Sequence, residues 1–105
     1  MYVLFGVNAL TIEEARSWVS ILSGLAGEPR SNEYNGHYYS FVHPDGGERM
    51  KLISGVCNDE EGSYPAERDF ADWKALLQVN EACAHSRTLK ALESQPEKFV
   101  KLRTG

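Results

Sequence analysis

The chain has 105 residues, with fifteen acidic side chains against eleven basic ones and a formal net charge of −4. This length suits one domain with a single hydrophobic core, and a hydrophobic content of 42% argues against a disordered chain. The negative charge argues against direct nucleic-acid binding, because proteins of that kind neutralise phosphates with basic side chains.

The first quarter of the chain predicts a buried strand followed by an amphipathic helix. The strand is expected over residues 1–7, which are apolar and rich in β-formers. Thr11 then opens the helix, and Glu14 completes a capping box in which its carboxylate accepts the Thr11 amide proton. Apolar residues recur at helical spacing until Gly24 and Gly27 end the helix.

The middle of the chain predicts a hairpin between two polar segments. Residues 28–36 are polar and carry turn residues, so we expect a loop there. Residues 37–42 and 49–54 alternate in polarity on either side of a strong turn signal at 44–47, a pattern typical of a hairpin. Residues 57–72 are too polar to enter a core and predict a long acidic loop.

The C-terminal third predicts a strand, a short helix and a final strand. Residues 73–79 end in β-formers and favour a third sheet element, although a helix through 71–77 competes with it. Good helix formers predict a helix over 87–94, which Pro96 closes. Residues 99–103 alternate apolar and basic side chains, as an edge strand protected from unwanted pairing does.

These elements give the order β-α-β-β-β-α-β over a single domain, 1–105. Runs of strands between two helices favour an α+β fold, a two-layer sandwich with two helices and a mainly antiparallel sheet, over a parallel α/β fold. In the first hairpin strand, alternate residues should face opposite sides of the sheet. Those on one side are Tyr38, Ser40 and Val42, and those on the other are Tyr39 and Phe41.

Charge is distributed unevenly along the sequence. Residues 1–83 carry a balance of −7, and residues 84–105 carry a balance of +3. Six acids, opposed only by Arg68, lie between positions 59 and 72. Such a run is often a solvated loop, and it can also form an anionic surface that attracts a basic partner. The six acids are Asp59, Glu60, Glu61, Glu67, Asp69 and Asp72.

The side chains that bind metals or perform catalysis are not spaced for either role. The three histidines and two cysteines show no C-x-x-C or H-x-x-x-H spacing, so we expect neither a metal site nor a cofactor. No G-x-S-x-G, P-loop or G-x-G-x-x-G motif occurs. Cys57 precedes an acidic run, which does not favour a reactive thiolate. The sequence therefore predicts a protein without enzymatic activity.

The expected location is the cytoplasm. The longest uncharged stretch, 1–12, contains Asn8 and Thr11, so we expect no membrane span, and no basic segment of a secretory signal precedes it. Two cysteines do not make a disulfide scaffold, which favours a reducing compartment.

Aromatic side chains near the acids are candidate binding anchors. Tyr64 lies among the acidic residues, and nothing around it in the sequence indicates burial. Phe70 and Trp73 either join it as anchors or pin the acidic loop to the domain. Tyr38 and Tyr39 alternate on a strand, which more often reflects core packing and cross-strand pairing.

Four segments together resemble small immunity proteins of bacterial polymorphic toxin systems, above all those that accompany contact-dependent growth-inhibition toxins. The segments are Leu4–Asn8, Thr11–Val19, Ser31–Tyr39 and Leu76–Asn80. The resemblance implies a cytoplasmic, non-catalytic protein that neutralises the C-terminal domain of one cognate toxin, often a nuclease. An acidic inhibitor suits such a partner, because a nuclease presents a basic cleft to its polyphosphate substrate.

The resemblance transfers no set of contact positions, so the expected interface rests on charge alone. It comprises the six acids between 59 and 72, with Tyr64 as an aromatic anchor. One alternative is a small-molecule-binding or enzymatic α+β domain, alone or as a dimer, with Tyr38, Tyr39 or His37 lining a pocket. Another is an adaptor whose basic final strand pairs with the sheet of a different protein.

Overall fold

A computed structural model describes residues 2–32, 36–43, 48–59, 62–65, 73–80 and 87–104, and for 56–59 and 62–65 it describes the backbone alone. Two helices and eight strands form in this part of the chain. In chain order they are β1 (Val3–Val7), α1 (Ile12–Ser23), β2 (Glu28–Asn32), β3 (Gly36–Val42), β4 (Arg49–Ser54), β5 (Val56–Asp59), β6 (Gly62–Pro65), β7 (Ala75–Asn80), α2 (Arg87–Glu93) and β8 (Phe99–Thr104).

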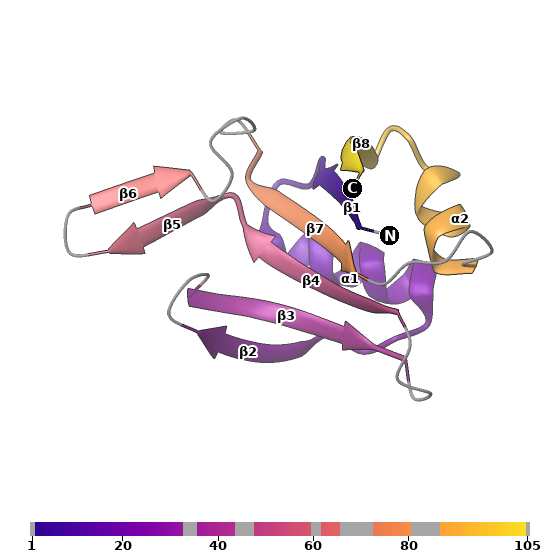
Figure 1. Cartoon of the computed structure of the whole chain (residues 1–105), viewed down its shortest axis with the longest axis horizontal. Coiled ribbons are helices and arrows are strands. Elements are labelled where there is room, and N and C mark those ends of the chain that lie inside the picture. Colours follow the sequence, from indigo (N-terminus) through magenta and orange to yellow (C-terminus); the bar gives the residue numbers. More distant parts are fainter. Residues whose placement is uncertain are drawn as a thin grey trace.

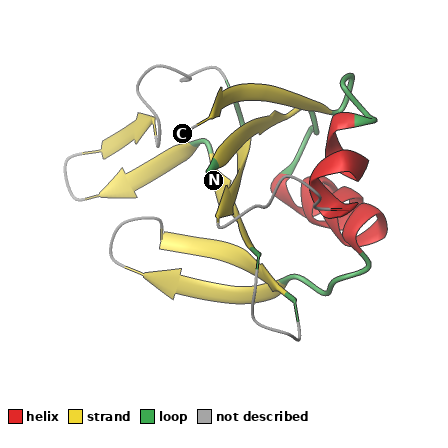
Figure 2. Ribbon diagram, turned by 45° about the vertical axis from the view of Figure 1, so that its right-hand side comes forward, coloured by secondary structure: helices red, strands yellow, loops and turns green. Residues whose placement is uncertain are grey.

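Six of the strands form one antiparallel sheet in the order β2-β3-β4-β7-β1-β8, with both helices packed on the same face (Figures 1 and 2). This confirms the predicted α+β class. The strands β4-β7-β1-β8 and the two helices follow the split β-α-β pattern, in which β7 lies between the parallel strands β1 and β4. Strands β2 and β3 extend this core beyond β4, and β5 pairs with β6 in a separate two-stranded sheet.

The N-terminal cap of α1 follows the prediction with one difference. The Thr11 hydroxyl accepts a hydrogen bond from the Glu14 amide at 3.1 Å, as expected for a capping residue. The Glu14 carboxylate, however, accepts from the Leu10 amide at 3.2 Å and not from that of Thr11. At the other end, Gly24 adopts φ of 72°, the left-handed conformation that closes many helices.

The main core lies between the sheet and the two helices. The strands contribute alternate residues, because side chains along a strand point to opposite faces. The helices contribute Ala15 and Val19 from α1 and Leu89 and Leu92 from α2. The strand residues in this core are Val3, Phe5, Val7, Phe41, Met50, Leu52, Ala75, Leu77, Val79 and Phe99.

The opposite face of the sheet, here called the open face, has a smaller apolar centre. Its buried members are Leu4, Ile53 and Leu76, which come from three adjacent strands. Four partly buried side chains pack around them, namely Tyr2, Tyr38, Trp73 and Leu102. Neither described helix covers this face, so the rest of it is available to polar side chains.

Two predicted loops are wrong. Residues 28–36 were expected to be a loop, but Glu28–Asn32 form β2 and pair with β3. Because β2 is an edge strand, it tolerates Pro29, whose nitrogen cannot donate a hydrogen bond. The acidic loop predicted over 57–72 instead contains β5 and β6, since cross-strand backbone pairing needs no apolar side chains.

The remaining elements agree closely with the sequence. Residues 75–80 form strand β7, so the helical alternative for this segment is wrong. β7 lies between β4 and β1 and is almost fully buried, which explains its run of apolar residues. The basic final strand β8 lies at the edge of the sheet as predicted, and its Lys101 forms an ion pair with Glu93 of α2.

Gly6 makes room for an indole on the open face. A Cβ atom at this position would overlap the ring of Trp73. We therefore expect Gly6→Ala to lower the free energy of unfolding by about 1–3 kcal/mol, the usual cost of overpacking. In a Trp73→Ala background the same substitution should cost much less, because the obstructing ring is gone. Urea unfolding of the four proteins measures this coupling, and additive losses would contradict the proposed contact.

Candidate functional site

Two of the seven predicted contact residues lie on the β5–β6 hairpin. Asp59 ends β5 opposite Gly62, and Tyr64 lies in β6 opposite Cys57. The hairpin pairs with no strand of the main sheet and extends away from the two helices (Figures 1 and 2). The other predicted contact residues lie outside the described residues, as does Phe70. They are Glu60, Glu61, Glu67, Asp69 and Asp72.

A tight backbone crossing sets the position of this hairpin. Gly55 is the residue between β4 and β5, and its amide donates a hydrogen bond to the Lys74 carbonyl at 2.8 Å. A Cβ atom on Gly55 would overlap the backbone of Trp73. Glycine therefore lets the chain pass from the main sheet into the hairpin directly beside the start of β7.

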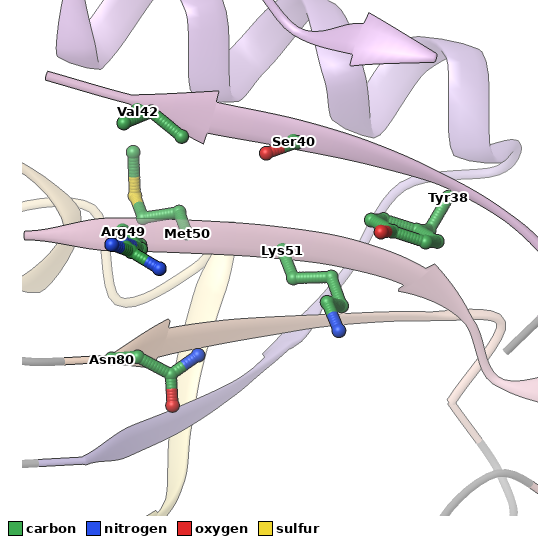
Figure 3. A pocket seen from close by; sticks show the side chains of 7 residues that line it. All are labelled: Tyr38, Ser40, Val42, Arg49, Met50, Lys51 and Asn80. Carbon is green, nitrogen blue, oxygen red and sulfur yellow. The ribbon is translucent and has the colours of Figure 1, made fainter. Parts of the chain in front are cut away.

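A second candidate site is a hollow of about 590 Å³ on the open face of the sheet (Figure 3). It lies over β3 and β4 and reaches the end of β7. Its described lining combines two cations, an amide, two hydroxyl groups and apolar surface. The lining residues are Tyr38, Ser40, Val42, Arg49, Met50, Lys51 and Asn80.

The two cations of the hollow lie on the same side of β4, because they are two residues apart. The Lys51 ammonium lies 4.7 Å from the centre of the Tyr38 ring, a cation–π contact that holds it over the sheet. Arg49 is exposed and sits opposite Val42 on β3 and Asn80 on β7. Within the described part of the chain, neither cation forms an ion pair.

Sequence reasoning singled out neither cation, although a signal was present. The alternation over 49–54 places Met50 and Leu52 on the core side, so Arg49 and Lys51 had to face the other way. Of the pocket residues predicted for the small-molecule alternative, Tyr38 does line the hollow. Tyr39 faces the helices instead, with its ring 4.4 Å from the Arg16 guanidinium.

A small polar cluster links the β3–β4 hairpin to α2. The His43 Nε2 atom lies 3.3 Å from the Thr88 hydroxyl and 3.7 Å from Glu48 Oε1. The Glu48 side chain is only 9% exposed, and its Oε2 atom is buried without a hydrogen-bond partner in the described structure.

This cluster does not have the geometry of a nucleophilic triad. In a triad, the hydroxyl and the carboxylate contact different ring nitrogens of the histidine. Here Thr88 and Glu48 both approach Nε2 of His43. Among the described residues, no group of three or more His, Cys, Asp or Glu side chains is placed to hold a metal ion.

Comparison with known proteins gives no functional assignment for these sites. No protein-family model matches the chain, and no curated protein is similar to it. Neither described helix is long and apolar enough to cross a membrane.

Thr88 offers a test of the polar cluster, because it is a buried polar residue at 5% exposure. Thr88→Val keeps the side-chain shape and removes the hydroxyl that contacts His43. We expect a loss of about 1 kcal/mol in the free energy of unfolding, as for a typical hydrogen bond. The matched control is Thr104→Val on exposed β8, which should change stability by less than about 0.5 kcal/mol. Equal effects in urea unfolding would show that the contact contributes nothing specific.

Proposed function

We propose that the chain is an immunity protein that binds and neutralises a cognate toxin domain, without catalysing a reaction. The observation that carries this proposal is where the acidic segment, defined here as residues 59–72, begins. This segment begins on the β5–β6 hairpin, which stands outside the main sheet and away from the helices (Figure 1). A projecting element that carries charge and an aromatic residue is suited to contact with a partner.

The energetics of the hairpin support a binding role. An isolated two-stranded hairpin is at best marginally stable in water. Strands β5 and β6 pair with each other and with no strand of the six-stranded sheet. The six-stranded sheet adds no strand pairing to the hairpin. A partner that packs against the hairpin would therefore stabilise it.

The charge of the acidic segment indicates the chemistry of the partner. Its six acids are opposed by Arg68 alone, so the partner should present a basic surface. A toxin domain that cleaves nucleic acid fits this description, because it must bind polyphosphate. Opposite charges also accelerate encounter, which suits an inhibitor that has to act before its toxin does. Such a toxin would meet its inhibitor in the cytoplasm, and we place the protein there.

Charge reversal in the acidic segment tests this proposal. We expect the triple variant Glu60→Lys, Glu61→Lys, Asp69→Lys to associate with the cognate toxin domain roughly 10- to 100-fold more slowly at low salt. The difference should shrink as salt rises, because exposed charges are then screened. Stopped-flow or surface plasmon resonance kinetics measure both effects, with the toxin domain encoded immediately upstream of this gene as the partner.

The matched control makes the same change in net charge at exposed acids away from the hairpin and the open face. Glu13→Lys, Glu93→Lys and Glu97→Lys lie on α1, on α2 and before β8. This variant should associate at close to the wild-type rate. Equal slowing of the two variants would show that net charge, and not the acidic segment, attracts the toxin. An unchanged rate in the first variant would refute the acidic interface.

The open-face hollow favours a second candidate function, the binding of a small molecule. Its volume of about 590 Å³ is within the range of ligand pockets, and Tyr38 supplies an aromatic wall. Native mass spectrometry of the chain purified from its own host separates the two functions. A stoichiometric basic toxin fragment supports the immunity role, whereas a bound metabolite on the chain alone supports the second function.

A further inference from the structure

Among the described residues, the open face carries more basic than acidic side chains, although the net charge of the protein is negative. Arg49 and Lys51 project into the hollow, and none of its described lining residues is acidic. Elsewhere on this face, Arg30 is already paired with Glu28 at 2.8 Å. The two hollow cations are thus available to an anion from outside, since neither forms an ion pair within the described residues.

We infer that this hollow is a second contact with the same toxin domain and that it receives carboxylate side chains of that partner. The inference rests on the proposed function and extends it. The interface would then combine both signs of charge, with the acidic segment facing basic groups of the toxin and the hollow facing acidic ones. A partner with charge of only one sign would satisfy half of such an interface.

The lining groups suit a carboxylate. A guanidinium presents parallel N–H donors that match the two oxygens of a carboxylate, and Arg49 supplies this fork. Lys51 adds a second positive charge, held by its contact with the Tyr38 ring. The Asn80 amide and the Ser40 hydroxyl can donate further hydrogen bonds from either side of β4. Val42, 47% exposed, provides apolar surface beside the charges.

The hairpin and the hollow are close enough for one partner to reach both. Arg49 begins β4, and Ser54 ends it, with Gly55 as the one residue between Ser54 and the hairpin. At a rise of about 3.3 Å per residue, these two positions are roughly 17 Å apart. A standard interface buries about 800 Å² on each partner, which corresponds to a patch roughly 30 Å across. One toxin domain can therefore cover both sites.

A carboxylate partner fits better than a nucleic acid. A polyanion would have to approach a chain of net charge −4, with only the two cations of the hollow to attract it among the described lining residues. The acidic segment also begins five residues after the end of the strand that carries those cations. The net negative charge of the chain repels a polyanion, but it repels a single carboxylate on a basic toxin domain much less. The basic groups around that carboxylate are attracted to the acidic segment.

The opposite-sign interface also provides specificity. A toxin with acidic groups opposite the acidic segment would be repelled there, and one with basic groups opposite the hollow would be repelled at the hollow. Immunity to one toxin among several basic ones needs such a second criterion, since an acidic surface alone attracts any basic protein.

Reversing the two cations tests the inference. We expect Arg49→Glu, Lys51→Glu to dissociate from the upstream-encoded toxin domain at least 10-fold faster than wild type at about 150 mM salt. The matched control, Arg87→Glu, Lys90→Glu, reverses two exposed cations on α2 and should stay within about 2-fold. The milder variant Arg49→Gln, Lys51→Met gives the same test if the reversal impairs folding, which circular dichroism will show. Restored affinity when a toxin Asp or Glu is changed to Lys would support a direct carboxylate contact.

The outcomes separate the inference from the proposed function. Wild-type dissociation of the cation variants, combined with slow association of the acidic-segment variant, overturns the hollow and leaves the immunity role intact. If neither set of variants affects toxin binding, both the hollow and the acidic segment are wrong as contact surfaces, and if the wild-type chain does not bind the toxin domain at all, the immunity role itself is wrong. If a single-stranded decanucleotide RNA binds the wild-type chain and not the Arg49 and Lys51 variants, the hollow is a nucleic-acid site and the carboxylate inference is wrong.

Discussion

The burial of strand β7 on both faces of the sheet is the constraint on which the rest of the structure depends. β7 joins the pair β1 and β8 to the strands β4, β3 and β2, so the six-stranded sheet exists only if β7 is in register with both neighbours. Leu77 and Val79 anchor it in the main core, and Leu76 anchors it in the apolar centre of the open face. A shift of β7 by one residue along its neighbours would turn Leu77 and Val79 to the open face and Leu76 to the helices. Neither side of the sheet would then pack correctly.

The two faces of the six-stranded sheet differ in how much apolar surface they bury. One face is apolar throughout the centre because both helices cover it, and it supplies most of the burial that stabilises the fold. On the open face, Trp73 packs over Gly6, and the apolar centre stays small. The surrounding surface can therefore hold Arg49 and Lys51 at no cost to the core. Both candidate binding surfaces therefore lie where the fold does not need burial.

The elements with strong apolar periodicity could be predicted from the sequence. The α1 helix, the β3–β4 hairpin and the basic edge strand β8 all form at or near the expected residues, because burial determines them. Strands β2 and β5–β6 could not be predicted in this way. They are held by backbone pairing at an edge or in a separate hairpin, so their side chains carry no apolar pattern.

The candidate sites, too, could be predicted from the sequence only in part. The acidic segment is visible in the sequence because charge is counted directly, although its hairpin is not. The hollow needs the register of three strands, which places Arg49 between Val42 and Asn80. The contact of Glu48, His43 and Thr88 joins residues up to 45 positions apart, and no local pattern connects them. Sequence reasoning finds charge and periodicity, whereas these sites depend on tertiary pairing.

We propose that the chain acts by holding a toxin domain against the hairpin and the open face. Hydrogen–deuterium exchange of the chain, alone and in complex with the proposed cognate toxin domain, can locate this contact. An isolated hairpin should exchange rapidly in the free chain. We expect strong slowing over 56–65 and at the β3 and β4 amides in the complex, with α1 unchanged. Slowing confined to the helices, with the hairpin still exchanging rapidly, would show that the toxin binds elsewhere.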